Sequence, residues 1–212
     1  MLEKLQPYMI GIAGPSCSGK TALAKYLMKK LGQDNCSLIQ LDSYYHDLSH
    51  LTPAKIEAHN YDHPGALEKE LLVKDISTIA EGDDIYVPVY DYVTHTRTRE
   101  KKLLKPVKFI LVEGLFTFYW EGLRKIFNTT VFINVKDSVC FSRRVTRDRK
   151  ERGVTLEYVL KQYKATVRPM FNKFIKPTRV YADLIVNGED PLEKSTCAIL
   201  KMFDQFRQLR NL

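Results

Sequence analysis

The glycine-rich segment at residues 14–21 (GPSCSGKT) constrains the fold of this chain more than any other feature. It matches the pattern G-x-x-x-x-G-K-[ST] at every fixed position. The apolar run 8–13 (YMIGIA) precedes it as a predicted buried strand, and 22–31 follows as a predicted helix with Gly32 as its stop. In such a unit the glycines let successive backbone N–H groups point inward, and the helix N-terminus adds its dipole. The sequence therefore predicts a loop that cradles phosphate groups.

Both the backbone and the side chains of this loop are expected to contact a nucleotide. Lys20 supplies a cation for the β- and γ-phosphates, and the Thr21 hydroxyl is a candidate Mg²⁺ ligand. Cys17 lies inside the loop, but its sulfur need not take part in chemistry. The predicted nucleotide-binding residues are Gly14, Ser16, Cys17, Ser18, Gly19, Lys20 and Thr21.

Strand-like and helix-like segments alternate along the rest of the chain. Further strands are predicted at 37–41, 85–92, 108–112, 130–135 and 183–186, and further helices at 67–80, 137–152, 155–172 and from about 190 onward. This alternation predicts an α/β fold with an open, mostly parallel sheet flanked by helices. Pro88 makes 85–92 an edge strand or one arm of a hairpin. Thr52 and Pro53 are predicted as the N-cap and first residue of a short helix.

The net charge of +8 is compatible with nucleic acid, an anionic membrane surface or small polyanionic substrates as partners. Much of the excess lies in residues 143–152 (RRVTRDRKER), and a run of this kind is usually a solvated helix face with a few phosphate-binding arginines. The chain shows no RNA-binding signature, no apolar run long enough to cross a bilayer and no secretory signal pattern. We therefore expect a cytoplasmic protein with neither a nucleic-acid nor a membrane partner. Its four scattered cysteines predict neither a disulfide nor a zinc site.

Two acidic residues follow predicted strands. Asp42 ends the second strand and Glu113 ends the strand at 108–112. Ligands in open α/β sheets bind beyond the carboxyl ends of the strands. A carboxylate there can hold metal-bound water or accept the proton of an attacking hydroxyl. The alternative is a loop or helix-capping carboxylate.

With these motifs in place, the chain resembles the uridine kinase (uridine–cytidine kinase) family over nearly its whole length. The resemblance is carried by GPSCSGKT, LDSYY at 41–45, NYDHPGAL at 60–67, VPVYDYVTHTR at 87–97, VEG at 112–114, RRVTRDRKERG at 143–153, QYKATVRPMF at 162–171 and YADLIV at 181–186. It implies a single P-loop kinase domain over residues 1–212, with a β-hairpin excursion at 84–106 that binds substrate and an arginine-rich helical lid at about 143–172.

The resemblance also implies an activity, namely transfer of the γ-phosphate of ATP to the 5′-hydroxyl of uridine or cytidine. It assigns Asp42 to orienting and deprotonating that hydroxyl, together with Lys20 and the lid residues Arg147 and Arg152 as catalytic groups. The implied Mg²⁺ site comprises Thr21, Glu113 and Asp42. The implied substrate contacts are Asp62, Arg144 and Gln162 on the ribose hydroxyls, and Tyr90 and His95 on the pyrimidine. GTP as an additional donor, and a tetrameric assembly, are further expectations from the family.

Some expectations concern specificity and leave alternatives open. A buried carboxylate and guanidinium on the ribose diol would favour ribonucleosides over 2′-deoxyribonucleosides. A neutral imidazole at His95 can donate or accept, so both uridine and cytidine are expected substrates; a histidine bonded to nearby backbone is the alternative. His63 is expected to brace Asp62. Val154 stands where the family commonly has a basic residue. A kinase for another small hydroxylated metabolite, and a nucleoside-binding regulator with little turnover, remain the competing interpretations.

Overall fold

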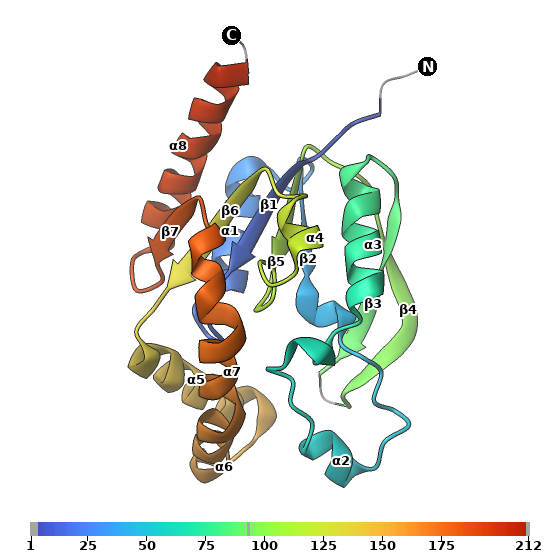
Figure 1. Cartoon of the computed structure of the whole chain (residues 1–212), viewed down its shortest axis with the longest axis vertical. Coiled ribbons are helices and arrows are strands. Elements are labelled where there is room, and N and C mark those ends of the chain that lie inside the picture. The colour runs from blue at the N-terminus through green and yellow to red at the C-terminus, as the bar shows by residue number, and fades with distance from the viewer. Residues whose placement is uncertain (1–3, 93, 211–212) are drawn as a thin grey trace.

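A five-stranded parallel sheet forms the centre of the molecule (Figure 1). The computed structural model describes residues 4–92 and 94–210, with side chains as far as Phe203. Along the sheet the strands follow the order β2-β5-β1-β6-β7. Their bounds are β1 Tyr8–Ala13, β2 Cys36–Gln40, β5 Phe109–Glu113, β6 Thr129–Asn134 and β7 Leu184–Asn187. Insertion of β5 between β2 and β1 brings the ends of three strands next to one another.

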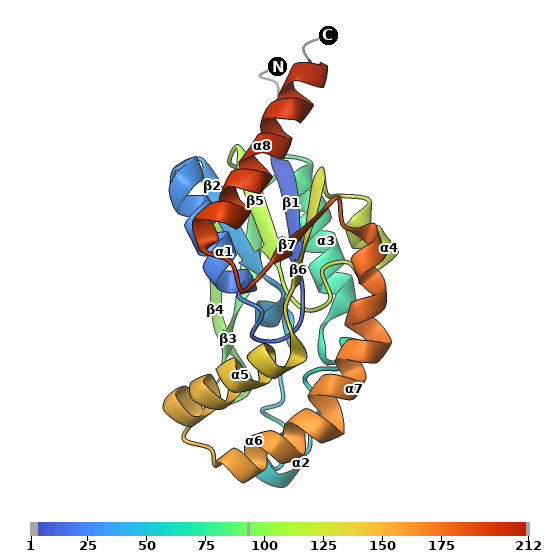
Figure 2. The same ribbon diagram turned by 90° about the vertical axis from the view of Figure 1, so that its left-hand side faces the viewer.

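Helices cover both faces of this sheet, as the alternating pattern predicted. The helices are α1 Lys20–Leu31, α2 Pro53–Glu57, α3 Lys69–Ala80, α4 Glu121–Arg124, α5 Asp137–Arg152, α6 Leu156–Gln162, α7 Arg168–Met170 and α8 Leu192–Arg210. Figure 2 looks onto the side where α1 and α8 lie. On this side Leu23 and Leu27 of α1 pack with Ile199 of α8 against the strand residues Ile10 and Ile12.

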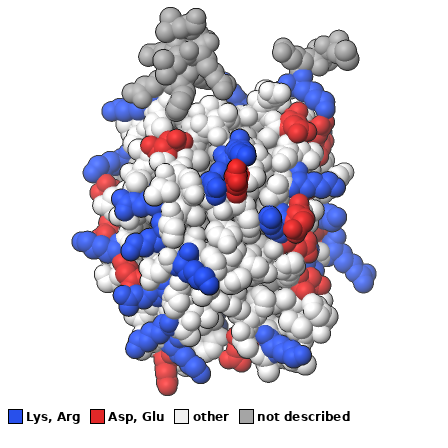
Figure 3. Space-filling model, in the orientation of Figure 1, with Lys and Arg blue, Asp and Glu red and all other residues white. Residues whose placement is uncertain are grey.

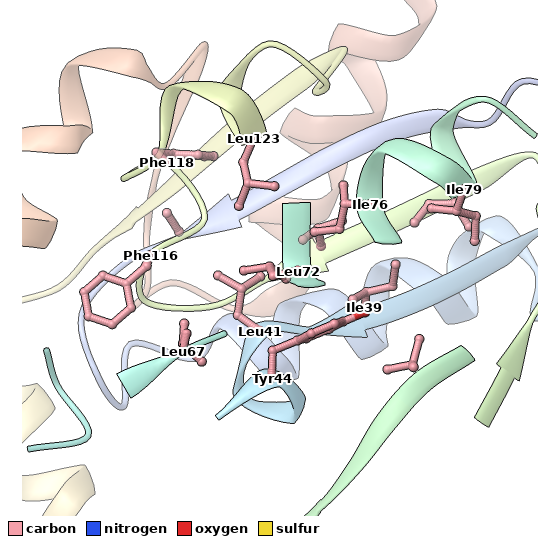
Figure 4. Packing of buried hydrophobic residues seen from close by; sticks show 14 of the residues in the cluster. Ile39, Leu41, Tyr44, Leu67, Leu72, Ile76, Ile79, Phe116, Phe118 and Leu123 are labelled. Carbon is pink, nitrogen blue, oxygen red and sulfur yellow. The ribbon is translucent and has the colours of Figure 1, made fainter. Parts of the chain in front are cut away.

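The larger part of the core lies on the opposite face, under α3 and α4. Figure 4 shows Leu72, Ile76 and Ile79 of α3 directed toward Ile39 of β2, with Leu123 of α4 beside them. All five side chains are fully buried. Leu72, Ile76 and Ile79 are three, four and seven residues apart, so they lie on one face of α3. This pattern is why the amphipathic segment folds as a helix on the sheet. This packing fixes the position of the neighbouring turn at Leu41–Tyr44.

A two-stranded antiparallel hairpin projects from the central sheet. It consists of β3, Ile85–Asp91, and β4, Thr96–Leu104, and its register shifts between Pro88 and Tyr90. The shift coincides with the proline that cannot donate a ladder hydrogen bond. In Figure 1 the hairpin lies on one side of the lower end of the sheet, and α5 and α6 lie on the other.

Several boundaries differ from the sequence predictions. The segment predicted as one helix over 155–172 contains wide turns at Tyr163–Val167 and Phe171–Ile175, with α7 between them. Pro169 lacks an N–H, so the regular hydrogen-bond ladder cannot pass through it, and the backbone widens locally. Pro53 begins α2 as expected, but the Thr52 side chain makes no capping hydrogen bond.

On the face shown in Figure 3 the lysine and arginine side chains are interspersed with aspartate and glutamate. The positive excess is therefore not concentrated in one large patch on this face. Within the described ranges, no helix combines the length and apolarity that crossing a membrane requires.

Candidate active site

A cleft of about 840 Å³ opens beyond the carboxyl ends of the strands, between the hairpin side and the α5–α6 side of the molecule. Residues from segments far apart in sequence line it. They include Ser16, Cys17, Gly19, Lys20, Thr21, Asp42, Asp62, Tyr90, His95, Arg144, Arg147, Arg152, Val154 and Gln162. The structure thus brings together nearly all of the residues singled out in the sequence. Gly14 and Ser18 are buried in the loop, and Glu113 reaches the cleft through its contact with Thr21.

The phosphate loop joins β1 directly to α1. Gly19 has a φ of 98°, and Cys17 also has a positive φ, of 61°. A β-carbon at Gly14 would lie 2.8 Å from the Ile133 carbonyl oxygen and 3.0 Å from Ser18 Oγ, so a larger residue would distort the loop. The Ser18 hydroxyl is buried and has no hydrogen-bond partner among the described residues. A curled backbone at the start of a 12-residue helix, with an unpaired buried hydroxyl, fits a bound phosphate.

Lys20 and Thr21 occupy the start of α1. The Lys20 ammonium donates to the Pro15 carbonyl at 2.9 Å, which keeps it folded over the loop. The Thr21 hydroxyl donates to Glu113 Oε1 at 2.7 Å, and Gln40 Nε2 donates to the same oxygen at 2.9 Å. Gln40 pairs with Glu113 in the sheet register, so neighbouring strands set this contact.

The donor set around Thr21 suits Mg²⁺ held jointly with a nucleotide. Mg²⁺ prefers oxygen ligands and usually takes one or two protein groups, with waters and phosphate oxygens completing its shell. Among the described residues no group of three or more His, Cys, Asp or Glu side chains forms a metal cage. Thr21 and Glu113 alone would leave most positions open for phosphate and water. The residues present therefore fit the ion as a partner of bound nucleotide.

Asp42 lies in the short turn Leu41–Tyr44 that follows β2 and lines the cleft. Burial, with the nearby Glu113 carboxylate as the next cause, raises the pKa of Asp42 to about 6, although Lys20 and Arg147 oppose the shift. Gly114 makes this proximity possible, because a β-carbon there would lie 2.6 Å from Leu41 Cβ. A carboxylate with a pKa near 6 is ionised at neutral pH and remains a competent proton acceptor.

A cluster of polar side chains in the cleft offers the hydrogen-bond donors and acceptors that would bind a diol. Arg144 is 6% exposed and donates to Gln162 Oε1 at 3.1 Å and to Ser16 Oγ at 3.2 Å. Asp62 is 9% exposed; burial raises its pKa, while Arg144, Arg147 and Arg152 act to lower it. The carboxylate and the guanidinium both border the cleft. His63 does not brace Asp62 as expected; its Nδ1 instead accepts from the Gly65 amide at 3.0 Å.

One residue that the sequence analysis missed organises the arginines of α5. Asp148 is 2% exposed and is shared by three guanidinium groups. Its carboxylate lies 3.2 Å from Arg144 Nε, 2.8 Å from Arg147 Nη2 and 3.6 Å from Arg152 Nη1. One negative charge thus faces three positive charges, which leaves an excess available to a polyanionic ligand. The i, i+4 spacing of Asp148 to Arg144 and Arg152 was the available sequence signal.

The hairpin contributes an aromatic wall. His95 stacks on Tyr61 with ring centroids 4.8 Å apart and an interplanar angle of 26°. The hydroxyls of Tyr61 and Tyr90 are buried and lie close enough for each to shift the pKa of the other. Burial, with Arg152 as the next cause, lowers the pKa of His95, so its imidazole is neutral at pH 7. Tyr45 contacts the rings of both Tyr61 and Tyr90. Sequence reasoning did not select Tyr45 or Tyr61, although both lie within the quoted motifs.

Fold and site together define a class of protein. A parallel sheet whose first strand ends in a lysine-bearing phosphate loop, next to strand-end carboxylates and facing a cluster of arginines, is the arrangement of a P-loop kinase. A solved phosphoribulokinase from Rhodobacter spheroides has the same fold, with a TM-score of 0.67 at 14% identity, covering 86% of this chain and 70% of that one.

Sequence relatives then place the chain more narrowly. A uridine kinase of Shewanella amazonensis is 44% identical over 189 residues, which are 87% of this chain and 89% of that protein. A uridine kinase of Vibrio vulnificus is 43% identical over 190 residues, 88% of this chain and 89% of that protein. The model of the phosphoribulokinase / uridine kinase family matches residues 9–190. The chain belongs to this family.

Proposed function

We propose that the protein is a uridine/cytidine kinase that transfers the γ-phosphate of ATP to the 5′-hydroxyl of a pyrimidine ribonucleoside. The observation that carries the proposal is a single cleft that joins the phosphate loop, Asp42 and the Tyr61–His95 wall. A triphosphate and a planar base can therefore be bound in one space, with a carboxylate available between them. The relatives named uridine kinase support the same acceptor.

In the proposed reaction the residues mainly position groups and neutralise charge. The loop amides and Lys20 hold the phosphates, and Arg147 and Arg152 neutralise charge on the transferred group. Asp42 orients the 5′-hydroxyl and accepts its proton. Mg²⁺, when bound beside Thr21 and Glu113, neutralises charge on the β- and γ-phosphates.

At the nucleoside end, Asp62, Arg144 and Gln162 bind the ribose hydroxyls. A 2′-deoxyribose would leave part of this buried polar group unpaired, so the site should select ribonucleosides. Tyr90 and the neutral His95 contact the exocyclic group of the base. Because that imidazole can donate to O4 of uracil or accept from the 4-amino group of cytosine, both bases are accepted.

The direct test incubates pure protein with Mg·ATP and a panel of nucleosides and separates the products by chromatography. UMP and CMP should form, and deoxyuridine should react with a kcat/KM at least about tenfold lower than that of uridine. Lys20→Ala should abolish turnover while the circular dichroism spectrum stays unchanged. Nucleoside binding without product, or comparable rates for uridine and deoxyuridine, would contradict the corresponding parts of the proposal. GTP as a second donor and a tetrameric assembly stay predictions, to be checked in the same assay and by light scattering.

A further inference from the structure

Arg97 lies in β4, two residues after His95, and connects the hairpin to other parts of the site. Its Nη1 lies 2.8 Å from Glu68 Oε2, and its Nη2 donates to the Tyr45 carbonyl oxygen at 2.8 Å. Its backbone amide donates to Asp47 Oδ1 at 3.1 Å. The Arg97 side chain is only 17% exposed, so water screens these contacts weakly.

The partners of Arg97 belong to the segments that carry the predicted catalytic and ribose-binding acids. Tyr45 directly follows the turn of Asp42, and its amide donates to the Asp42 carbonyl oxygen at 3.5 Å. Glu68 directly precedes α3, and its amide donates to the Tyr44 carbonyl oxygen at 2.9 Å. The stretch that ends at Glu68 begins near Asp62, and its Leu67 forms a β-bridge with Tyr45. One guanidinium therefore joins the segments of Asp42 and His95 to Glu68, which precedes α3.

This connection depends on the chemistry of arginine. The planar guanidinium presents several N–H groups in a fixed fork, so it can hold a carboxylate and a carbonyl oxygen in a defined relative direction. A lysine ammonium could pair with Glu68 but would not fix the direction of the Tyr45 carbonyl. Close to Arg97, the rings of Tyr45 and Tyr90 are in contact, with centroids 5.5 Å apart. Movement of the hairpin relative to the Leu41–Tyr44 turn would disturb both the bond from Arg97 to the Tyr45 carbonyl and the ring contact between Tyr45 and Tyr90.

We propose that Arg97 is a positioning residue that couples occupation of the hairpin by the nucleobase to the placement of Asp42. The proposal rests on the nucleoside kinase activity described above. Contacts made by the base hold the hairpin, and the hairpin holds the Asp42 turn through Arg97. Binding energy from the base, which does not react, thereby improves the alignment of the 5′-hydroxyl and appears in kcat rather than in affinity.

The test compares wild-type protein with Arg97→Gln and Arg97→Lys. Calorimetry gives the Kd for uridine, and steady-state assays give kcat for uridine and for ATP hydrolysis without nucleoside. Arg97→Gln should lower kcat with uridine about 10- to 100-fold, as expected for a misplacement of about 1 Å. Its Kd for uridine should change less than about threefold, and its nucleoside-independent ATP hydrolysis should stay at the wild-type rate. The kcat of Arg97→Lys with uridine should lie between those of wild-type protein and Arg97→Gln.

The matched control is Arg99→Gln, which removes an exposed arginine two residues further along β4 and should leave all three quantities unchanged. Unchanged kcat in Arg97→Gln overturns the inference, as does a loss of uridine binding as large as the loss of kcat. If thermal melting shows that Arg97→Gln does not fold, Arg97→Lys decides by the same criteria. Absence of UMP from the wild-type protein would instead overturn the proposed function, and this inference with it.

Discussion

Asp42 is held in surroundings that oppose its charge. Burial and Glu113 raise its pKa to about 6, against an unfolded value of about 3.9. Between these two pH values the folded state retains a proton that the unfolded state has lost. This contribution to stability is therefore present below about pH 4 and is lost as pH rises through about 6. At neutral pH the protein maintains an ionised carboxylate here at the expense of stability.

Asp42→Asn should consequently separate stability from activity. At pH 7.5 the variant should gain ~2 kcal/mol in free energy of unfolding, measured by urea denaturation without nucleotide, because the disfavoured charge is gone. The gain should shrink toward pH 4. Loss of the proton acceptor should lower kcat by about 10²- to 10⁴-fold. Asp34→Asn, at an exposed carboxylate after α1, is the control. Wild-type turnover in Asp42→Asn would exclude the proposed role.

His95 leads to a prediction about base preference. Its pKa is lowered, first by burial and then by Arg152, so protonation sets in at a pH below the ordinary value of about 6.5. A protonated imidazole has two donors and no acceptor, so it can still donate to O4 of uracil but cannot accept from the 4-amino group of cytosine. The ratio of kcat/KM for uridine over cytidine should therefore rise as the pH falls below about 6.5.

Direct competition between the two nucleosides in one reaction measures this ratio. Ionisation of enzyme groups that affect both reactions equally then cancels from the ratio. In His95→Gln the ratio should lose its pH dependence, because an amide does not titrate in this range. A wild-type ratio that stays constant down to the lowest pH at which the protein remains folded would contradict contact of His95 with the exocyclic group.

At the scale of elements, α5 depends on the buried Asp148 to hold its arginines. Asp148→Asn would leave three guanidinium groups without their shared counter-charge. Breaking a buried ion pair on one side typically costs ~3 kcal/mol or more. We therefore expect a fall of that size in the free energy of unfolding, measured by urea denaturation. Glu157→Gln, at an exposed carboxylate of α6, should change the same quantity by less than about 0.5 kcal/mol.

The same variant tests whether these arginines are a phosphate site. Tripolyphosphate can replace the lost carboxylate as a counter-ion, so it should raise the Tm of Asp148→Asn more than it raises the Tm of wild-type protein. Equal shifts in the two proteins would indicate that the arginines of α5 do not face bound phosphates.

For the whole molecule, the cleft lies between the hairpin side and the α5–α6 side, and Arg147 and Asp42 both line it. In the proposed reaction the nucleotide and the nucleoside share these residues. Each ligand at about 100 times its Kd should stabilise the fold by ~2.7 kcal/mol, which corresponds to a Tm rise of a few degrees. With a non-hydrolysable ATP analogue and uridine together, the rise should exceed the sum of the separate rises, because ordering of the shared residues is required once rather than twice. In Lys20→Ala the nucleoside effect should persist while the nucleotide effect is reduced. Strictly additive Tm shifts would mean that the nucleotide and the nucleoside bind independently of each other.

The sequence by itself determined the phosphate loop, the parallel α/β class and the presence of a hairpin. These features depend on consecutive residues: glycines and Lys20 in the loop, apolar runs in the strands and Pro88 in the hairpin. Tertiary structure alone decided the strand order that places Glu113 between the loop and Asp42. It also decided the burial of Asp148, the stack of Tyr61 on His95 and the contacts of Arg97. The physical reason is that charge interactions and ring contacts depend on distances between segments, which are set by how helices and strands pack and not by the order of neighbouring residues.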